Sequence, residues 1–183
     1  MINEPIRLLA DWLSGTLKDA SNVDRGLNVQ LAALTTDDSD PAPPAVTVVD
    51  ETREGPAARN EPGDELPALI VSLQSLSAES TTMSPATGPR QIPLTVGFRY
   101  VAKEGVSATA VAQAYYTAQA IMMSWSYLVL PANEAKRVRN GVTIIPYSDP
   151  QSGFDLQPVL AQREDDHVSI GLTLRLLARR TIP

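Results

Sequence analysis

Hydrophobic residues recur at helical spacing in two stretches of the chain. The first set, Ile6, Leu9, Leu13 and Leu17, follows Asn3, a residue type that caps helices, and predicts a helix from about residue 4 to 19. A longer apolar stretch runs from Ala108 to Leu130, where Ser107 or Thr109 can begin a helix and Pro131 ends it. Polar residues interrupt this second stretch, so we expect a buried helix there rather than a membrane span.

Other stretches have the pattern of strands. Residues 92 to 100 and 167 to 178 alternate regularly between apolar and polar positions. Residues 66 to 76 are apolar on both faces near their centre, so this strand should lie inside a sheet. Further strands are expected at residues 45 to 49, 141 to 147 and 154 to 160.

The order of these elements predicts the fold class. A helix, two or three strands, the long helix and three more strands follow one another without repeating β-α-β units. We therefore expect a single α+β domain over residues 1 to 183. It should have a mainly antiparallel sheet with one long helix packed on it and an amino-terminal helix.

Two long connections separate the predicted elements. The segment from Asp37 to Glu65 is rich in proline and holds nine acidic residues, with only Arg53 and Arg59 as bases. Such a composition favours a solvated loop. A second segment at about residues 77 to 91, rich in Ser, Thr and Pro, should form a long hairpin loop.

Composition and charge argue against several classes of protein. The chain has no cysteine, which excludes disulfides and cysteine-based zinc sites. Its net charge is −6, and the sequence shows no clustered basic face of the kind that nucleic-acid binders carry. Residues 1 to 5 lack the basic and apolar regions of a signal peptide.

No combination of residues predicts catalysis or a bound cofactor. His167 is the only histidine and could act as a base, although a loop-end histidine beside two solvated acids is the simpler interpretation. The run from Asp37 to Asp40 suggests calcium but lacks the glycine and closing glutamate of an EF-hand loop. Phosphate-binding motifs are missing, and Gly141 and Gly153 suit turns. We expect no catalytic, cofactor-binding or metal-binding residues.

Basic residues gather in two places along the sequence. Lys136, Arg137 and Arg139 follow the long helix, and Arg175, Arg179 and Arg180 lie near the carboxyl end. Helix-end charge and solubility explain these groups without any specific role. The functional alternative is a docking surface for an acidic partner.

The order and size of the elements resemble the tail terminator (tail completion) proteins of long-tailed bacteriophages. The segments that carry the resemblance are the helix Ile6 to Leu17, the strands 66–71 and 92–100, the helix Ala108 to Leu130 and the strand 168–177. The resemblance implies a non-enzymatic subunit of the virion, assembled in the host cytoplasm. Such a subunit forms a ring, expected to be hexameric, that caps the tail tube, ends its polymerisation and joins it to the neck.

The same resemblance defines the expected partners and interaction residues. The partners are identical copies of the chain, the major tail tube protein and a neck or head-completion protein. DNA would pass transiently through the lumen, and no membrane is involved. Eight residues are candidates for these contacts: Thr82, Met83, Arg90, Arg99, Arg137, Arg139, Arg179 and Arg180. The alternatives are another head–tail connector, a tail tube subunit, or a small enzyme or ligand-binding module.

Overall fold

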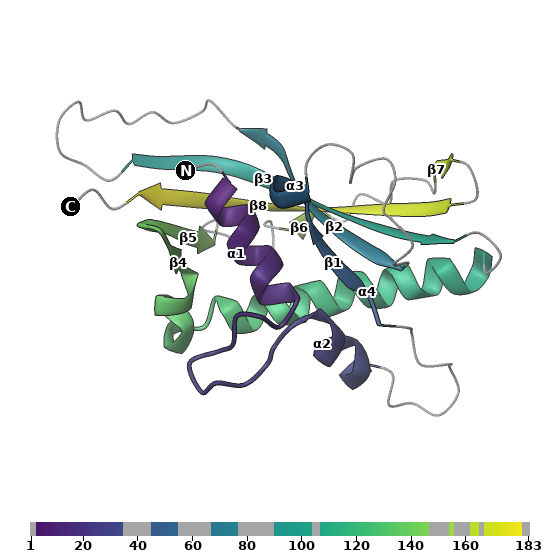
Figure 1. Ribbon diagram of the computed structural model, residues 1–183, viewed down its shortest axis with the longest axis horizontal. Helices are drawn as coiled ribbons and strands as arrows, with labels where there is room; N and C mark the ends of the chain where they lie inside the picture. The colour runs from purple at the N-terminus through teal and green to yellow at the C-terminus, as the bar shows by residue number, and fades with distance from the viewer. Residues whose placement is uncertain are drawn as a thin grey trace.

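The structure is a computed structural model, and it describes residues 3–34, 45–54, 67–76, 90–103, 107–146, 154–155, 162–164 and 167–180. Helices and one curled sheet make up the fold (Figure 1), which confirms the α+β class. Helix α1 crosses the sheet, and the long helix α4 runs along it with α2 beside α4.

The helices and strands have the following bounds. The helices are α1 (Asn3–Leu13), α2 (Leu27–Leu34), α3 (Glu51–Glu54), α4 (Ser107–Leu128) and the 3-10 helix η2 (Pro131–Arg137). The strands are β1 (Thr47–Asp50), β2 (Ala68–Leu76), β3 (Arg90–Lys103), β4 (Val138–Arg139), β5 (Val142–Pro146), β6 (Phe154–Asp155), β7 (Gln162–Glu164) and β8 (His167–Arg180).

The sheet has the strand order β1-β2-β3-β8-β5-β4, and β6 and β7 also pair with β8. Strand β1 runs parallel to β2, whereas the other described pairs are antiparallel. The expectation of a mainly antiparallel sheet therefore holds in part, because one edge strand is parallel. That edge strand comes from the short apolar stretch inside the acidic segment, as its sequence predicted.

A long ribbon of two strands forms the centre of the sheet. β3 and β8 pair over their whole length, from Arg90 opposite Arg180 to Lys103 opposite His167. Their apolar positions alternate as predicted, and Val96, Phe98, Leu174 and Leu176 are buried on the side that faces the helices. The hydrophobic effect of this burial fixes which side of the ribbon faces the core.

Strand β2 lies between β1 and β3 and is buried on both of its faces at its centre. Leu69 and Val71 join the main core beneath the helices, whereas Ile70 belongs to a small second cluster with Val49 and Val101. This arrangement confirms that the doubly apolar stretch belongs inside the sheet.

The predicted amino-terminal helix is too long by several residues. α1 ends at Leu13, and Gly15 follows with a positive φ of 77°, a conformation that ends helices. Leu17 continues the helical spacing in sequence, but it packs on the core from the turn that follows the helix. A second helix, α2, was not predicted at all.

The long helix agrees with its predicted bounds to within two residues at each end. Trp125 on α4 and Trp12 on α1 are both buried, and the Trp12 indole donates a hydrogen bond of 3.0 Å to the carbonyl of Ser124. These contacts place α1 against α4, and both tryptophans pack in the core.

Some predictions lie outside the described residues. They include the loop character of residues 37–44 and 55–65, the loop at 77–89, and the part of the 154–160 strand beyond Asp155. The candidate residues Thr82 and Met83 also lie outside them.

Candidate interaction surfaces

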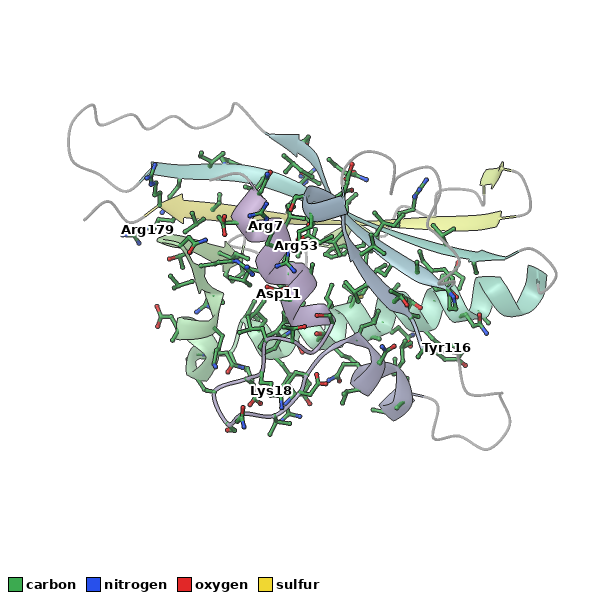
Figure 2. The ribbon with its side chains drawn as sticks, viewed as in Figure 1. Arg7, Asp11, Lys18, Arg53, Tyr116 and Arg179 are labelled. Carbon is green, nitrogen blue, oxygen red and sulfur yellow. The ribbon has the colours of Figure 1, made fainter. Side chains whose placement is uncertain are left out.

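Asp11, on α1, joins the two edges of the sheet. Its carboxylate accepts two hydrogen bonds from Arg53, which follows β1, at 3.0 and 3.1 Å. It also forms an ion pair with Arg139 of β4, the strand at the opposite edge. Figure 2 shows Arg7, Asp11 and Arg53 close together along α1. A single helix thereby holds strands that are far apart in the sheet.

Glu4 extends this group two turns earlier on α1. Its carboxylate lies 3.2 Å from Nε of Arg139 and accepts a hydrogen bond of 3.0 Å from the side chain of Asn140. Asn140 and Gly141 both have positive φ, 48° and 73°, and they form the tight turn between β4 and β5. Gly141 is therefore a turn glycine, as predicted.

Asp50 and Thr52 complete the group on the β1 side. Asp50 accepts hydrogen bonds from the backbone and hydroxyl of Thr52, and its other oxygen lies 3.2 Å from Nε of Arg53. Thr52 in turn accepts a hydrogen bond from Arg7. We call these residues the α1 clasp: Glu4, Arg7, Asp11, Asp50, Thr52, Arg53, Arg139 and Asn140. Each of the three carboxylates in the clasp forms an ion pair with at least one of its three arginines.

The turn between α1 and α2 is built around a second buried carboxylate. Asp19 accepts hydrogen bonds of 2.8 Å from the backbone N–H groups of Ser21 and Val23, and Arg25 donates another at 3.0 Å. The hydrogen bond from Val23 is the main cause that lowers the pKa of Asp19. The Arg25 guanidinium also lies over the ring of Tyr127, 4.5 Å from its centroid.

The contact between β3 and α4 includes one buried hydroxyl. Tyr100 donates a hydrogen bond of 3.2 Å to the side-chain oxygen of Gln113. Burial raises the pKa of Tyr100 to about 12, so its phenol stays neutral over the physiological range. This residue holds the sheet to the helix rather than exchanging protons.

Helix α4 has an exposed face without any charge. The sequence contains no charged residue from Gly105 to Asn133, although charged residues make up 20% of the chain. We call the exposed residues of this helix the α4 outer face: Ala112, Tyr115, Gln119, Met122 and Ser126. Tyr115 is 58% exposed and Met122 is 38% exposed. The neighbouring helix α2 also lacks charged residues and exposes Val29.

The sheet face that points away from α1 and α4 carries three arginines. Because side chains alternate along a strand, Arg99 points away from its buried neighbours Phe98 and Tyr100. Arg175 and Arg179 on β8 point the same way and are exposed. We call this side the outer sheet face. None of its three arginines forms an ion pair within the described residues.

The structure separates the predicted interaction residues into several environments. Arg99 and Arg179 share the outer sheet face, whereas Arg139 lies in the α1 clasp. Arg180 is exposed at the end of β8, and Arg90 pairs with it through the backbone. Arg137 ends η2, and its Nε atom is buried without a hydrogen-bond partner.

Sequence reasoning missed the α1 clasp and the grouping on the outer sheet face. The Asn140-Gly141 pair was an available signal for a tight hairpin that brings Arg139 back toward the sheet. Glu4 and Asp11 stand two helical turns apart, which places them on one side of α1. No sequence signal identified Arg53 as the partner of Asp11, because 42 residues separate them.

Among the residues that the structure describes, no three potential metal ligands come together. Within the same residues, none of the helices, α4 included, has the length and hydrophobicity needed to cross a membrane. No known protein-family model matches the sequence, and no curated protein matches it either.

Proposed function

We propose that this chain is a non-enzymatic assembly subunit that associates with identical copies into a closed ring. In keeping with its resemblance to tail terminator proteins, the ring would cap a phage tail tube, end its growth and join it to the neck. The observation that carries the proposal is the uncharged α4 outer face.

A helix on the surface of a soluble protein ordinarily presents charged and polar side chains to water. The α4 outer face instead presents Tyr115, Met122 and small or amide side chains, and no residue of the helix can supply a charge. Tyrosine and methionine are enriched at protein interfaces, whereas charged residues are depleted from the centre of such interfaces. The composition of this face therefore favours contact with another protein.

The helix is also long enough to contribute substantially to an interface. Its 22 residues span roughly 33 Å at a rise of 1.5 Å per residue. The uncharged helix α2 lies against it and widens the apolar surface. A stable interface buries roughly 800 Å² on each partner, and a helix of this length with its neighbour can provide a large part of that area.

Light scattering coupled to size-exclusion chromatography tests the proposal. Wild-type protein should elute as a discrete oligomer of defined mass, and Met122→Glu should shift it toward the monomer because the change buries a charge in the interface. Val138→Glu is the matched control, since Val138 is 47% exposed but lies on β4. A monomeric wild type at high concentration, or equal effects of both changes, would contradict the proposal.

Electron microscopy separates a terminator from a tail tube subunit. A terminator stops at one ring and, added to growing tubes, should limit their length. A tube subunit would instead polymerise by itself into long tubes. Rings that leave tube length unchanged would indicate another head–tail connector.

A further inference from the structure

Seven arginines of the described residues differ in their ion pairing according to the side of the sheet on which they lie. On the side of α1 and α4, Arg7, Arg25, Arg53 and Arg139 each form an ion pair with a carboxylate. On the outer sheet face, Arg99, Arg175 and Arg179 form none within the described residues. Three arginines without an ion pair in the described residues therefore share one surface, whereas Arg137 and Arg180, which also form none there, lie elsewhere in the fold.

The strand register places the three arginines along a line on the β3–β8 ribbon. Arg99 lies opposite Gly171, and Arg175 lies opposite Thr95, four residues further along both strands. Arg179 follows after another four residues. At about 3.3 Å per residue, successive arginines are roughly 13 Å apart.

On β3, β5 and β8 the residues between these arginines are neutral, whereas β6 places Asp155 opposite Thr173 and β7 places Glu164 opposite His167. Gln91 and Thr143 flank Arg179 on the neighbouring strands. Pro93, Leu177 and Ile145 form a half-buried apolar row between Arg175 and Arg179. Since no acidic side chain of β3, β5 or β8 lies on this face in the described residues, the surface suits an extended acidic partner.

The composition of the chain favours a second copy of itself as that partner. Nine acidic residues occur between Asp37 and Glu65, and the whole chain has a net charge of −6. Asp50 is already paired within the α1 clasp and Glu51 also has a partner in the fold, so the other seven are the candidates for this contact. A chain of this net charge is repelled by nucleic-acid phosphates at long range, whereas its own acidic segment complements the arginine row. Guanidinium groups bind carboxylates through paired hydrogen bonds, which gives such a contact specificity.

We propose that the outer sheet face of one subunit binds the acidic segment Asp37–Glu65 of the next subunit. This inference rests on the proposed function and specifies the contact that joins neighbours. The contact joins two different surfaces, and each subunit carries both of them. It is therefore a heterologous contact. A heterologous contact closes into a ring when its rotation permits.

Charge reversal at two exposed positions tests the outer sheet face. For the double variant Arg175→Glu/Arg179→Glu, the protein concentration at which half of the subunits are assembled should rise by roughly tenfold or more, because like charges now face each other. The control Lys18→Glu/Lys136→Glu changes the net charge by the same amount at positions away from this face. The control should assemble as the wild type does, and unchanged urea midpoints of both variants would show that they fold.

Complementation tests the identity of the partner. A second variant, Asp37→Asn/Asp38→Asn/Asp40→Asn, should also lose assembly, since it lacks part of the acidic surface. Mixed with the arginine variant, it should form heterodimers that grow no further, because each component retains one intact surface. Native mass spectrometry distinguishes these heterodimers from monomers and rings.

Each of the following results would overturn the inference. Intact rings from the arginine variant would do so while leaving the proposed function standing, whereas a monomeric wild type would reject both. Failure of the two variants to form heterodimers would show that the acidic segment is not the partner. Salt-dependent binding of duplex DNA that the arginine variant loses, with assembly unchanged, would assign the face to nucleic acid instead.

Discussion

The turn after α1 depends on a glycine in a conformation that other residues rarely adopt. Gly15 has a φ of 77°, and a Cβ atom placed there would lie 2.5 Å from a carboxylate oxygen of Asp24. Asp24 cannot easily move away, because it accepts a hydrogen bond of 2.7 Å from the backbone of Gly26. The close approach of residues 15, 24 and 26 therefore ends the helix where the apolar spacing alone would continue it.

We expect Gly15→Ala to lower the free energy of unfolding by about 1–2 kcal/mol, since it combines left-handed strain with a steric clash. Gly97→Ala is the matched control. The three atoms nearest to a Cβ at Gly97 would all belong to the side chain of Gln74, which is exposed and can move. Urea unfolding of both variants measures the difference, and equal losses would contradict the role assigned to Gly15.

Asp19 makes the stability of the same turn depend on pH. Its pKa is lowered, chiefly by the hydrogen bond from the Val23 backbone, so the folded state favours the ionised carboxylate. The stabilisation is fully present above the unfolded-state pKa of about 4 and is lost as pH falls through the lower folded-state pKa. Asp19→Asn should therefore destabilise the protein more at neutral pH than in acid. Unfolding midpoints at the two pH values measure this, and a pH-independent difference would count against it.

At the scale of elements, α1 functions as a brace across the curled sheet. It contacts β1 and β2 at one edge and β4 and β5 at the other. Apolar burial supplies most of the attachment, since Ile6, Leu9 and Trp12 are almost completely buried. The α1 clasp fixes the orientation of α1 on the sheet, because Asp11 pairs with an arginine from each edge.

We expect Asp11→Asn to cost about 1–2 kcal/mol of unfolding free energy, because it weakens ion pairs to Arg53 and Arg139 at once. The Asp11 side chain is only 17% exposed, which reduces the screening of these pairs by water. Glu134→Gln removes the same charge from an exposed position and should cost little. A double-mutant cycle with Arg139→Gln provides the measurement, and additive effects would show that the pair is not coupled.

The sequence predicted the long elements and missed the short ones for a physical reason. β3, β8 and α4 each contain many apolar positions, so their periodicity is unambiguous. α2 has only eight residues and no cap or charge pattern that would indicate it. The end of α1 was wrong because Leu17 keeps the helical spacing although Gly15 has already turned the chain.

The candidate surfaces were accessible from sequence only in part. The absence of charge in α4 is visible in the sequence, but which of its residues are exposed depends on how the helix packs. Arg99 and Arg175 are far apart in sequence, and they share a face only because β3 and β8 pair in one particular register. Along the sequence no basic residues cluster into a face, and the pairing of β3 with β8 brings Arg99 to the same side of the sheet as Arg175 and Arg179.

The whole molecule has two unlike surfaces on opposite sides of its sheet. The α4 outer face is uncharged, and the outer sheet face carries three arginines that form no ion pair within the described residues. An apolar contact and an electrostatic contact respond differently to salt, since screening weakens only the second. Measuring assembly during a titration with sodium chloride therefore separates the contributions of the two surfaces.

If identical copies stabilise each other through these surfaces, thermal stability must depend on protein concentration. Only folded subunits assemble, so assembly stabilises the folded state relative to the unfolded state. The unfolding midpoint temperature should therefore rise with protein concentration. Met122→Glu should flatten this dependence while leaving the midpoint at low concentration close to that of the wild type, because Met122 is already 38% exposed in the monomer. Scanning calorimetry over a hundredfold range of protein concentration provides the measurement. Over this range, linkage to assembly changes the stability by roughly 3 kcal/mol. A wild-type midpoint that stays constant over this range would show that the folded subunit gains nothing from its own copies.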